Sequence, residues 1–357
     1  MTEKRLRWRL ADEAPDGPQG ALFDDPVFEV EPGRGEYRDL TFLHVRAKRI
    51  INDLKGSWLP FRHTINAYRG CSHACSYCFA RSTHTYLDLD AGDDFDRKVV
   101  VKVNAASLLA RELHPTRWAG EHIAMGTNTD PYQRCEAKFR LTRGIVEVLA
   151  ERRNPFSILT KSTLVLRDLD LLAAAARTTD VRVNLSIGTL DEDVWRATEP
   201  GTPHPRQRVK AVAALNAAGV PCGVLVAPVL PGLSDAPEQL DAVVAACVAA
   251  GARSISTVVL HLRPGVREVF LERLAVTHPH LVADMADRYR DRAYVPKVEQ
   301  ARVADHVHAL VRRLGGASAS PRAARHLAGE AAPVPTAVDP PRGRRAPDAP
   351  GDQLTLL

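Results

Sequence analysis

The stretch Cys71-Ser72-His73-Ala74-Cys75-Ser76-Tyr77-Cys78 places three thiols within a single loop of the chain. Their spacings of four and three residues let the thiols converge, but they leave a four-thiolate cage one ligand short. Four-cysteine ferredoxin patterns make closed electron carriers, whereas a cluster with three protein ligands keeps one iron open to a substrate or cofactor. The loop therefore predicts a chemically active metal centre.

Zinc is the competing metal. Three cysteines and a histidine are a common structural zinc set, and His63 and His73 lie near the thiols. The pattern is not the paired C-x₂-C with a distant second pair that is typical of zinc ribbons, which favours iron. Buried thiols without any metal are the remaining alternative, and so tight a cluster argues against it.

The residues around the loop resemble a known family. The cysteine spacing, Tyr77 just before the last cysteine and the lead-in Asn66-Ala67-Tyr68-Arg69-Gly70 resemble the radical S-adenosylmethionine (SAM) superfamily. The flanking residues resemble the branch of DNA repair photolyase or spore photoproduct lyase-like proteins. The resemblance runs from about Thr64 to about Arg263.

The resemblance implies a cofactor pair and a reaction. Cys71, Cys75 and Cys78 would ligate a [4Fe-4S] cluster whose open iron binds SAM. Electron transfer into the sulfonium would then release a 5′-deoxyadenosyl radical, which abstracts hydrogen from a substrate. An external electron donor of the flavodoxin or ferredoxin type is implied as a partner, and a DNA lesion as the substrate.

Composition places the chain among ordinary globular proteins. It has 357 residues, of which 45% are hydrophobic and 25% charged. The net charge of +5 favours an anionic partner only weakly, because 43 acidic residues dilute the 48 basic ones. The sequence has no apolar run of membrane-spanning length and no signal-peptide core at its start, so we expect a cytoplasmic protein without a membrane.

Strand-like runs alternate with helical patterns from Thr64 onward, which is typical of parallel α/β folds. The expected strands are Thr64–Arg69, His122–Thr127, Phe156–Lys161, Val181–Ile187, Gly223–Pro228 and Ser254–His261. Amphipathic helices are expected at Ala105–Leu113, Thr142–Arg153, Leu166–Ala176, Arg206–Ala218 and Ala236–Ala250. Together with the family resemblance, six such strands predict a partial (β/α)6 TIM-type barrel.

The chain divides into four expected parts. Residues 1–58 form an N-terminal extension in which Thr41–Val45 reads as an added strand, and residues 59–265 form the barrel core. Residues 266–315 have helical spacing and are expected to cover the open side of the barrel. Residues 316–357 are rich in Pro, Ala and Arg, which predicts a disordered tail.

Polar residues at the strand exits are candidates for SAM binding, because barrel active sites form at the carboxyl ends of the strands. Many superfamily members carry Gly-Gly-Glu after the second strand, whereas this chain has Thr127-Asn128-Thr129-Asp130-Pro131-Tyr132-Gln133. Thr129 and Asp130 can supply acceptors for the ammonium of SAM. The alternative is an Asx turn made by Asp130. A lysine, Lys161, follows the third strand, where it can meet a carboxylate or phosphate.

The later segments add further cofactor candidates. Asn184 and Ser186 share one face of the fourth strand, which in a barrel is the inside. The resemblance places Glu199 and Arg208 near the ribose and carboxylate of SAM, with a turn and a helix start as the alternative.

An adenine pocket is expected from Tyr77 and from the apolar exits of the fifth and sixth strands, which include His261. The alternatives are plain packing for Tyr77 and a structural role for His261. Spore photoproduct lyase-type chemistry also needs a hydrogen-atom donor, for which Cys135 is the candidate. Cys247 reads as a core residue, and Cys222 opens a strand at the far end.

The last five residues, Gln353-Leu354-Thr355-Leu356-Leu357, resemble the short peptides that bind the bacterial DNA sliding clamp. The leading hypothesis is thus a radical SAM enzyme acting on a DNA lesion. One alternative keeps this chemistry but moves it to RNA, a peptide or a small molecule. The alternative of another class is a metal-stabilised nucleic-acid- or clamp-binding module without catalysis.

Overall fold

The computed structural model describes residues 27–54 and 61–317. Residues 318–357 of the predicted tail, including the clamp-like peptide Gln353–Leu357, lie outside these ranges. Within the two ranges, no helix combines the length and the apolarity needed to cross a bilayer.

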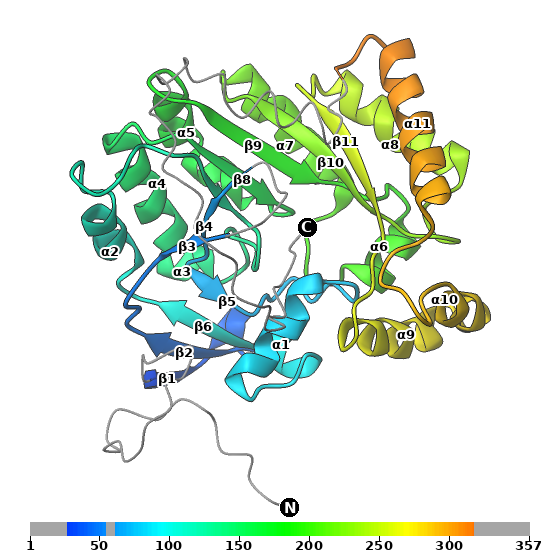
Figure 1. Ribbon diagram of the computed structural model, residues 1–357, viewed down its shortest axis with the longest axis horizontal. Helices are drawn as coiled ribbons and strands as arrows, with labels where there is room; N and C mark the ends of the chain where they lie inside the picture. Colours follow the sequence, from blue (N-terminus) through cyan, green and yellow to red (C-terminus); the bar gives the residue numbers. More distant parts are fainter. Residues whose placement is uncertain (1–26, 55–60, 318–357) are drawn as a thin grey trace, which may run out of the picture.

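The larger of two sheets contains the six predicted parallel strands (Figure 1). Its order is β11-β10-β9-β8-β7-β4-β3, and every neighbouring pair is parallel except β3 and β4. The strands are β3 (Ile51–Asp53), β4 (His63–Ile65), β7 (Ile123–Met125), β8 (Phe156–Thr160), β9 (Val181–Ser186), β10 (Cys222–Val229) and β11 (Ile255–Val259). This curved sheet confirms the α/β partial barrel.

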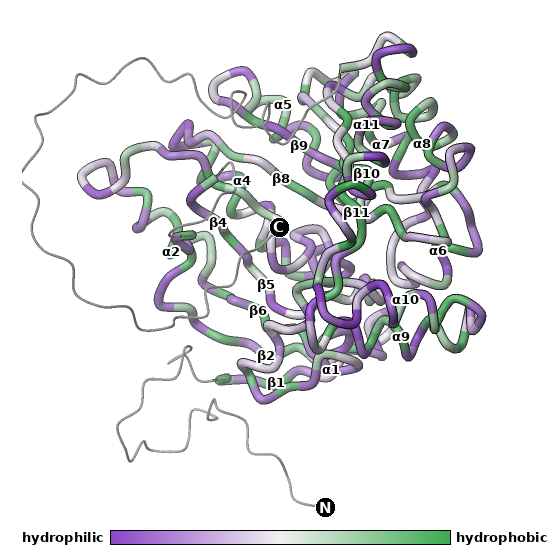
Figure 2. The backbone as a smooth tube through the Cα atoms, turned by 45° about the vertical axis from the view of Figure 1, so that its right-hand side comes forward, coloured by the Kyte–Doolittle hydropathy of each residue, from purple (hydrophilic) through white to green (hydrophobic). Residues whose placement is uncertain are grey.

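Helices connect successive strands on the outside of the curved sheet (Figure 1). They are α2 (Ala105–Glu112), α4 (Leu141–Glu151), α5 (Leu169–Ala176), α7 (Pro205–Ala217) and α8 (Pro237–Ala249), while the shorter α3 (Glu136–Phe139) and α6 (Glu192–Thr198) follow the exits of β7 and β9. Short 3₁₀ segments add η1 (Gly35–Tyr37), η2 (Phe79–Leu87), η3 (Thr163–Asp168) and η4 (Pro279–Leu281). Figure 2 shows hydrophobic residues along the central strands and hydrophilic ones in the connecting loops. The main core therefore lies between the sheet and its helices.

A second, four-stranded sheet differs from the sequence expectation. It has the order β1-β2-β6-β5, built from β1 (Val27–Pro32), β2 (Thr41–Val45), β5 (Tyr68–Arg69) and β6 (Lys98–Lys102), with α1 (Asp93–Arg97) beside it. The residues expected as an extension contribute β1 and β2 to this sheet, with β2 at the bounds expected for the added strand, and β3 to the larger sheet. The expected strand Thr64–Arg69 is split, because Tyr68 and Arg69 pair with β6 instead of continuing in the barrel. The chain therefore enters the cysteine loop from the second sheet.

The helices after the last barrel strand are α9 (Val266–Thr277), α10 (Val282–Arg288) and α11 (Lys297–Arg313). Helix α11 packs against β11 and α8, whereas α9 packs against α6 and η2. Thus α9 lies beside the segment that follows the cysteine loop (Figure 1).

Candidate active site

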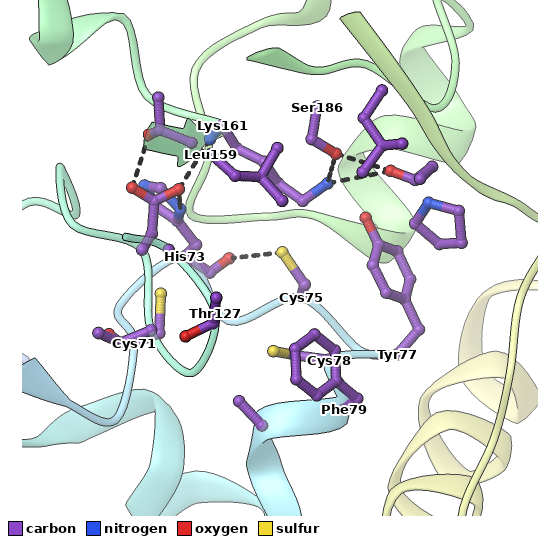
Figure 3. A pocket seen from close by; sticks show the side chains of 18 of the residues that line it. Cys71, His73, Cys75, Tyr77, Cys78, Phe79, Thr127, Leu159, Lys161 and Ser186 are labelled. Carbon is purple, nitrogen blue, oxygen red and sulfur yellow. Dashed lines mark hydrogen bonds and ion pairs between the residues drawn. The ribbon is translucent and has the colours of Figure 1, made fainter. Parts of the chain in front are cut away.

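A cavity of about 960 Å³, counting its open mouth, lies at the carboxyl ends of the barrel strands. The cysteine loop forms one wall, and the exits of β7, β8, β9, β10 and β11 form the others. The side chains of Cys71, Cys75 and Cys78 all line it (Figure 3).

The three thiols surround a cavity and not a point. In the described ranges, no three His, Cys, Asp or Glu side chains are arranged to hold a single metal ion. Zinc needs its thiolates at about 2.3 Å, whereas in an iron–sulfur cluster each thiolate binds a different iron. Three thiols that line one cavity are a donor set that fits an iron–sulfur cluster with three protein ligands. Burial raises the pKa of the Cys71, Cys75 and Cys78 thiols, so metal binding there must displace protons.

The start of the cysteine loop is held by the segment that leaves β7. The Gln133 amide oxygen accepts a hydrogen bond from the Ser72 N–H at 2.9 Å, and its nitrogen donates to the Gly70 carbonyl at 3.0 Å. The Thr129 hydroxyl donates to the same carbonyl at 2.7 Å. Gln133 is completely buried, so these bonds are shielded from water. Thr129 lines the cavity, and its hydroxyl positions the loop.

The middle of the loop is held by the segment after α6. The Gly201 N–H donates to the His73 carbonyl at 3.0 Å, and the Ser76 N–H donates to the Thr198 carbonyl at 2.9 Å. A Cβ atom at position 201 would lie only 2.1 Å from the Ser72 carbonyl oxygen. Only glycine lets the two backbones approach this closely.

We therefore expect Gly201→Ala to destabilise the protein by about 1–3 kcal/mol, the usual cost of overpacking, and to lower its iron content after reconstitution. Thermal unfolding and iron analysis measure both effects. Gly144→Ala in α4 is the control, because its Cβ would meet only the Ala106 side chain, at 3.2 Å. A Gly201→Ala protein with wild-type melting temperature and iron content would contradict this packing argument.

Asp130 lies in the cavity wall at the exit of β7, with a saturated carboxylate. It accepts hydrogen bonds from the Thr160 hydroxyl at 2.6 Å and from the Lys161 and Tyr132 N–H groups at 2.7 and 2.8 Å. His73 Nδ1 lies 3.3 Å from it. Burial raises the pKa of Asp130, but His73 and the hydrogen bonds outweigh burial and hold the pKa below its usual value. Asp130 is thus a fixed negative charge that also forms the expected turn.

A second charged cluster lies at the exits of β8 and β9, centred on the buried carboxylate of Glu199. Arg208 Nη2 lies 2.5 Å from it and Lys161 Nζ 3.1 Å, and the Tyr77 hydroxyl donates a hydrogen bond to it. Burial raises the pKa of Glu199, but the charges of Arg208 and Lys161 hold it far below its ordinary value. Arg208 and Lys161 share the single carboxylate of Glu199, so these three side chains together carry one excess positive charge.

Of the two cations, Lys161 faces the cavity (Figure 3). Its Nζ also donates to the Ser186 hydroxyl at 2.6 Å and to the Ala227 carbonyl at 3.3 Å. Arg208 lies behind it and donates to the carbonyls of Ser186 and Pro203 at 3.1 and 2.9 Å. The excess charge is therefore presented to the cavity through the lysine.

One lining residue has an unused acceptor. The side-chain oxygen of Asn128, at the exit of β7, is buried and has no hydrogen-bond partner, although the residue lines the cavity. An unsatisfied buried acceptor is costly unless a ligand or water supplies a donor. In the sequence, Asn128 is one residue of the motif Thr127–Gln133, and His73 is only a candidate zinc ligand. No local pattern marks either residue as part of a cofactor site before the fold is known.

The remaining candidates fall into two groups. Tyr77, Ser186 and His261 line the cavity, with His261 stacked on Tyr294 at 5.2 Å between ring centroids. Burial lowers the pKa of His261 to about 4, so the ring is neutral at pH 7. Asn184 does not line the cavity.

The structure does not bring Cys135 to this cavity. It is completely buried at the start of α3, within the main hydrophobic core, and burial raises the pKa of its thiol well above the ordinary value. Cys247 also lies in this core, as expected, and so does Cys222, which opens β10. Of the cysteines in the described residues, only Cys71, Cys75 and Cys78 therefore line the cavity.

A partial parallel barrel with three thiols in the cavity at its mouth is an arrangement that can hold a metal cofactor. The radical SAM superfamily model matches residues 65–243, half of the chain. The chain belongs to the radical SAM superfamily. Its cofactors are therefore a [4Fe-4S] cluster and SAM, and it depends on an electron donor.

Relatives and solved structures agree with this assignment. An uncharacterized protein of Mycobacterium tuberculosis is 45% identical over 277 residues, which are 77% of this chain and 82% of that protein. An uncharacterized protein of Methanocaldococcus jannaschii is 31% identical over 197 residues, 55% of this chain and 70% of that one.

Among solved structures, a spore photoproduct lyase variant with bound AdoMet and dinucleoside spore photoproduct superimposes with a TM-score of 0.58. The match covers 80% of this chain and 85% of that one at 20% identity. A second variant of the same lyase gives 0.59 at 19% identity over the same shares. At these identities the likeness defines the fold.

Proposed function

We propose that Cys71, Cys75 and Cys78 hold the [4Fe-4S] cluster with one iron left open, and that SAM binds beside it in the cavity. The observation that carries this proposal is that the three thiols line the same cavity as a negative charge, on Asp130, and a positive charge, on Lys161. The reduced cluster of this superfamily cleaves SAM and supplies a 5′-deoxyadenosyl radical. This chain's residues bind and orient the cofactor and exclude water.

The charges of the wall match the amino acid end of SAM. The unpaired oxygen of Asn128, at the exit of β7, is an acceptor for an ammonium, and the ionised carboxylate of Asp130 adds a negative charge to the same wall. Lys161, which presents the excess charge of the Glu199 cluster, is a partner for a carboxylate. The ammonium of SAM would lie at the exit of β7, near Asn128 and Asp130, and its carboxylate would pair with Lys161.

SAM affinity should depend on Lys161. We expect Lys161→Met to weaken SAM binding at least ~30-fold, because truncating one partner of a buried charge pair costs about 2 kcal/mol or more. Equilibrium dialysis with anaerobically reconstituted protein measures the change. Lys210→Met, which removes an exposed lysine of α7, should leave the affinity unchanged. Equal affinities for the wild type and Lys161→Met would remove the lysine from the site.

We propose a nucleic-acid lesion as the substrate, in a repair reaction of the spore photoproduct lyase kind. The support is the shared fold and the motif at the exit of β7, which resembles the photolyase-like branch. A barrel hosts many reactions, so this step is an analogy. The proposed partners are DNA, a flavodoxin- or ferredoxin-type donor, and a sliding clamp at Gln353–Leu357.

The deciding experiment is anaerobic incubation of the reconstituted protein with SAM, a reductant and ultraviolet-damaged DNA. We expect about four irons per chain, release of 5′-deoxyadenosine, and conversion of the lesion to thymine. Release of 5′-deoxyadenosine with every lesion intact would disprove the repair assignment and turn the search to RNA, peptides or small molecules. One zinc and no cleavage would favour a non-catalytic binding module.

A further inference from the structure

Two arginines that do not line the cavity hold the backbone of the cysteine loop. Arg81, in η2, is completely buried. Its Nε donates to the Cys75 carbonyl at 2.9 Å, and Nη1 donates to the carbonyls of Ala91 and Gly92 at 2.9 and 3.0 Å. Nη2 lies 2.6 Å from the Asp96 carboxylate. A guanidinium in this setting is both a scaffold and a charge close to the loop.

The second arginine comes from the C-terminal helices. Arg273, on α9, donates from Nη1 to the Ala74 carbonyl at 2.9 Å, and its Nη2 lies 2.5 Å from the other oxygen of Asp96. Ala74 has a φ of +52°, a conformation that costs a non-glycine residue free energy and persists only where its surroundings fix it. Arg273 supplies one of those constraints.

The charges of this group do not cancel. Arg81 and Arg273 share the single carboxylate of Asp96, so one positive charge remains behind the consecutive residues Ala74 and Cys75. Low-dielectric surroundings strengthen the effect of such a charge, because Arg81 and Asp96 are buried. Net charge around an iron–sulfur cluster is one of the factors that set its reduction potential.

We propose that Arg273 is a positioning residue that ties helix α9 to the cluster loop and, with Arg81 and Asp96, raises the reduction potential of the cluster. The inference rests on the proposed ligand set Cys71, Cys75 and Cys78. A positive charge favours the reduced cluster, because reduction adds a negative charge. The C-terminal cover thus takes part in setting how readily the cluster accepts its electron.

Two substitutions with opposite charge effects test this role. Arg273→Gln keeps a donor for the Ala74 carbonyl but removes the excess charge, whereas Asp96→Asn adds one positive charge to the group. At a fixed solution potential we expect the ratio of reduced to oxidised cluster to fall about tenfold in Arg273→Gln, which is ~59 mV for one electron. The ratio should rise in Asp96→Asn. The measurement is a redox titration of the reconstituted cluster followed by electron paramagnetic resonance.

Matched controls separate charge from packing. Glu272→Gln changes the charge of α9 by the same amount at an exposed position and should leave the potential unchanged. If the Asp96→Asn variant takes up no cluster, the Arg273→Lys variant is measured in its place. We expect it to keep the wild-type reduction potential, because lysine keeps the positive charge at position 273. Shifts of the same sign in Arg273→Gln and Asp96→Asn, or an unshifted Arg273→Gln with full iron content, would overturn the inference. A wild type without a cluster would instead refute the proposed ligand set.

Discussion

Cys75→Ala should lose both the brown colour of the cluster and the reductive cleavage of SAM, with cleavage falling at least ~100-fold. In the proposed ligand set each thiolate holds one iron, so removing one of three would leave the cluster without a stable protein site. Iron and sulfide analysis after anaerobic reconstitution, and quantification of 5′-deoxyadenosine, measure the two losses. Circular dichroism checks that the chain remains folded.

Cys135→Ala is the matched control, because it removes a buried thiol that does not line the cavity. This variant should keep its iron and its SAM cleavage. If Cys75→Ala still cleaved SAM, the assignment of Cys75 as an iron ligand would be wrong. If Cys135→Ala lost its cluster while remaining folded, the choice of the three loop thiols would need revision.

Glu199→Gln should destabilise the protein by about 3–5 kcal/mol, the usual cost of removing one partner from a buried ion pair. The substitution leaves Lys161 and Arg208 without their shared carboxylate. Urea unfolding measures the change. Glu192→Gln is the control, because its carboxylate pairs with Arg196 at the surface and should contribute less than about 1 kcal/mol. Equal losses in both variants would contradict the network.

The pH dependence of stability provides a second test of Glu199. Its pKa is lower in the folded protein than in the unfolded chain, where it is about 4.5. Its contribution to stability is therefore fully present above pH 4.5 and is lost as the pH falls toward the folded value. We expect the wild type to lose more stability than Glu199→Gln between pH 6 and pH 3. Parallel losses would mean that Glu199 is not held ionised by its partners.

The sequence predicted the barrel because six of its strands are separated by helices with clear amphipathic spacing. It did not predict the second sheet as a unit. Strand β6 joins two neighbours far from each other in the chain, and Tyr68 and Arg69 look continuous with the preceding strand in composition. Which of two possible partners a short segment pairs with depends on tertiary contacts, so local patterns cannot decide it.

The candidate site was predictable where spacing carries the chemistry. The three thiols follow from their spacing alone, and the family resemblance added Glu199 and Arg208. The sequence did not indicate which of the cations Lys161 and Arg208 would face the cavity. That depends on the strand exits, which place Lys161 in the wall and Arg208 behind Glu199. The unpaired oxygen of Asn128 is likewise visible only once its surroundings are known.

The contacts that fix the cysteine loop have a consequence for synthesis of the chain. The contacts of the loop include the Gly201 N–H, after α6, and the Arg273 side chain on α9. Both residues are synthesised after the three cysteines. A nascent chain that ends before α9 already contains the three cysteines but lacks the hydrogen bond from Arg273 to the Ala74 carbonyl. The loop that carries the proposed cluster ligands therefore acquires its full set of contacts only after α9 has been synthesised and has packed against it.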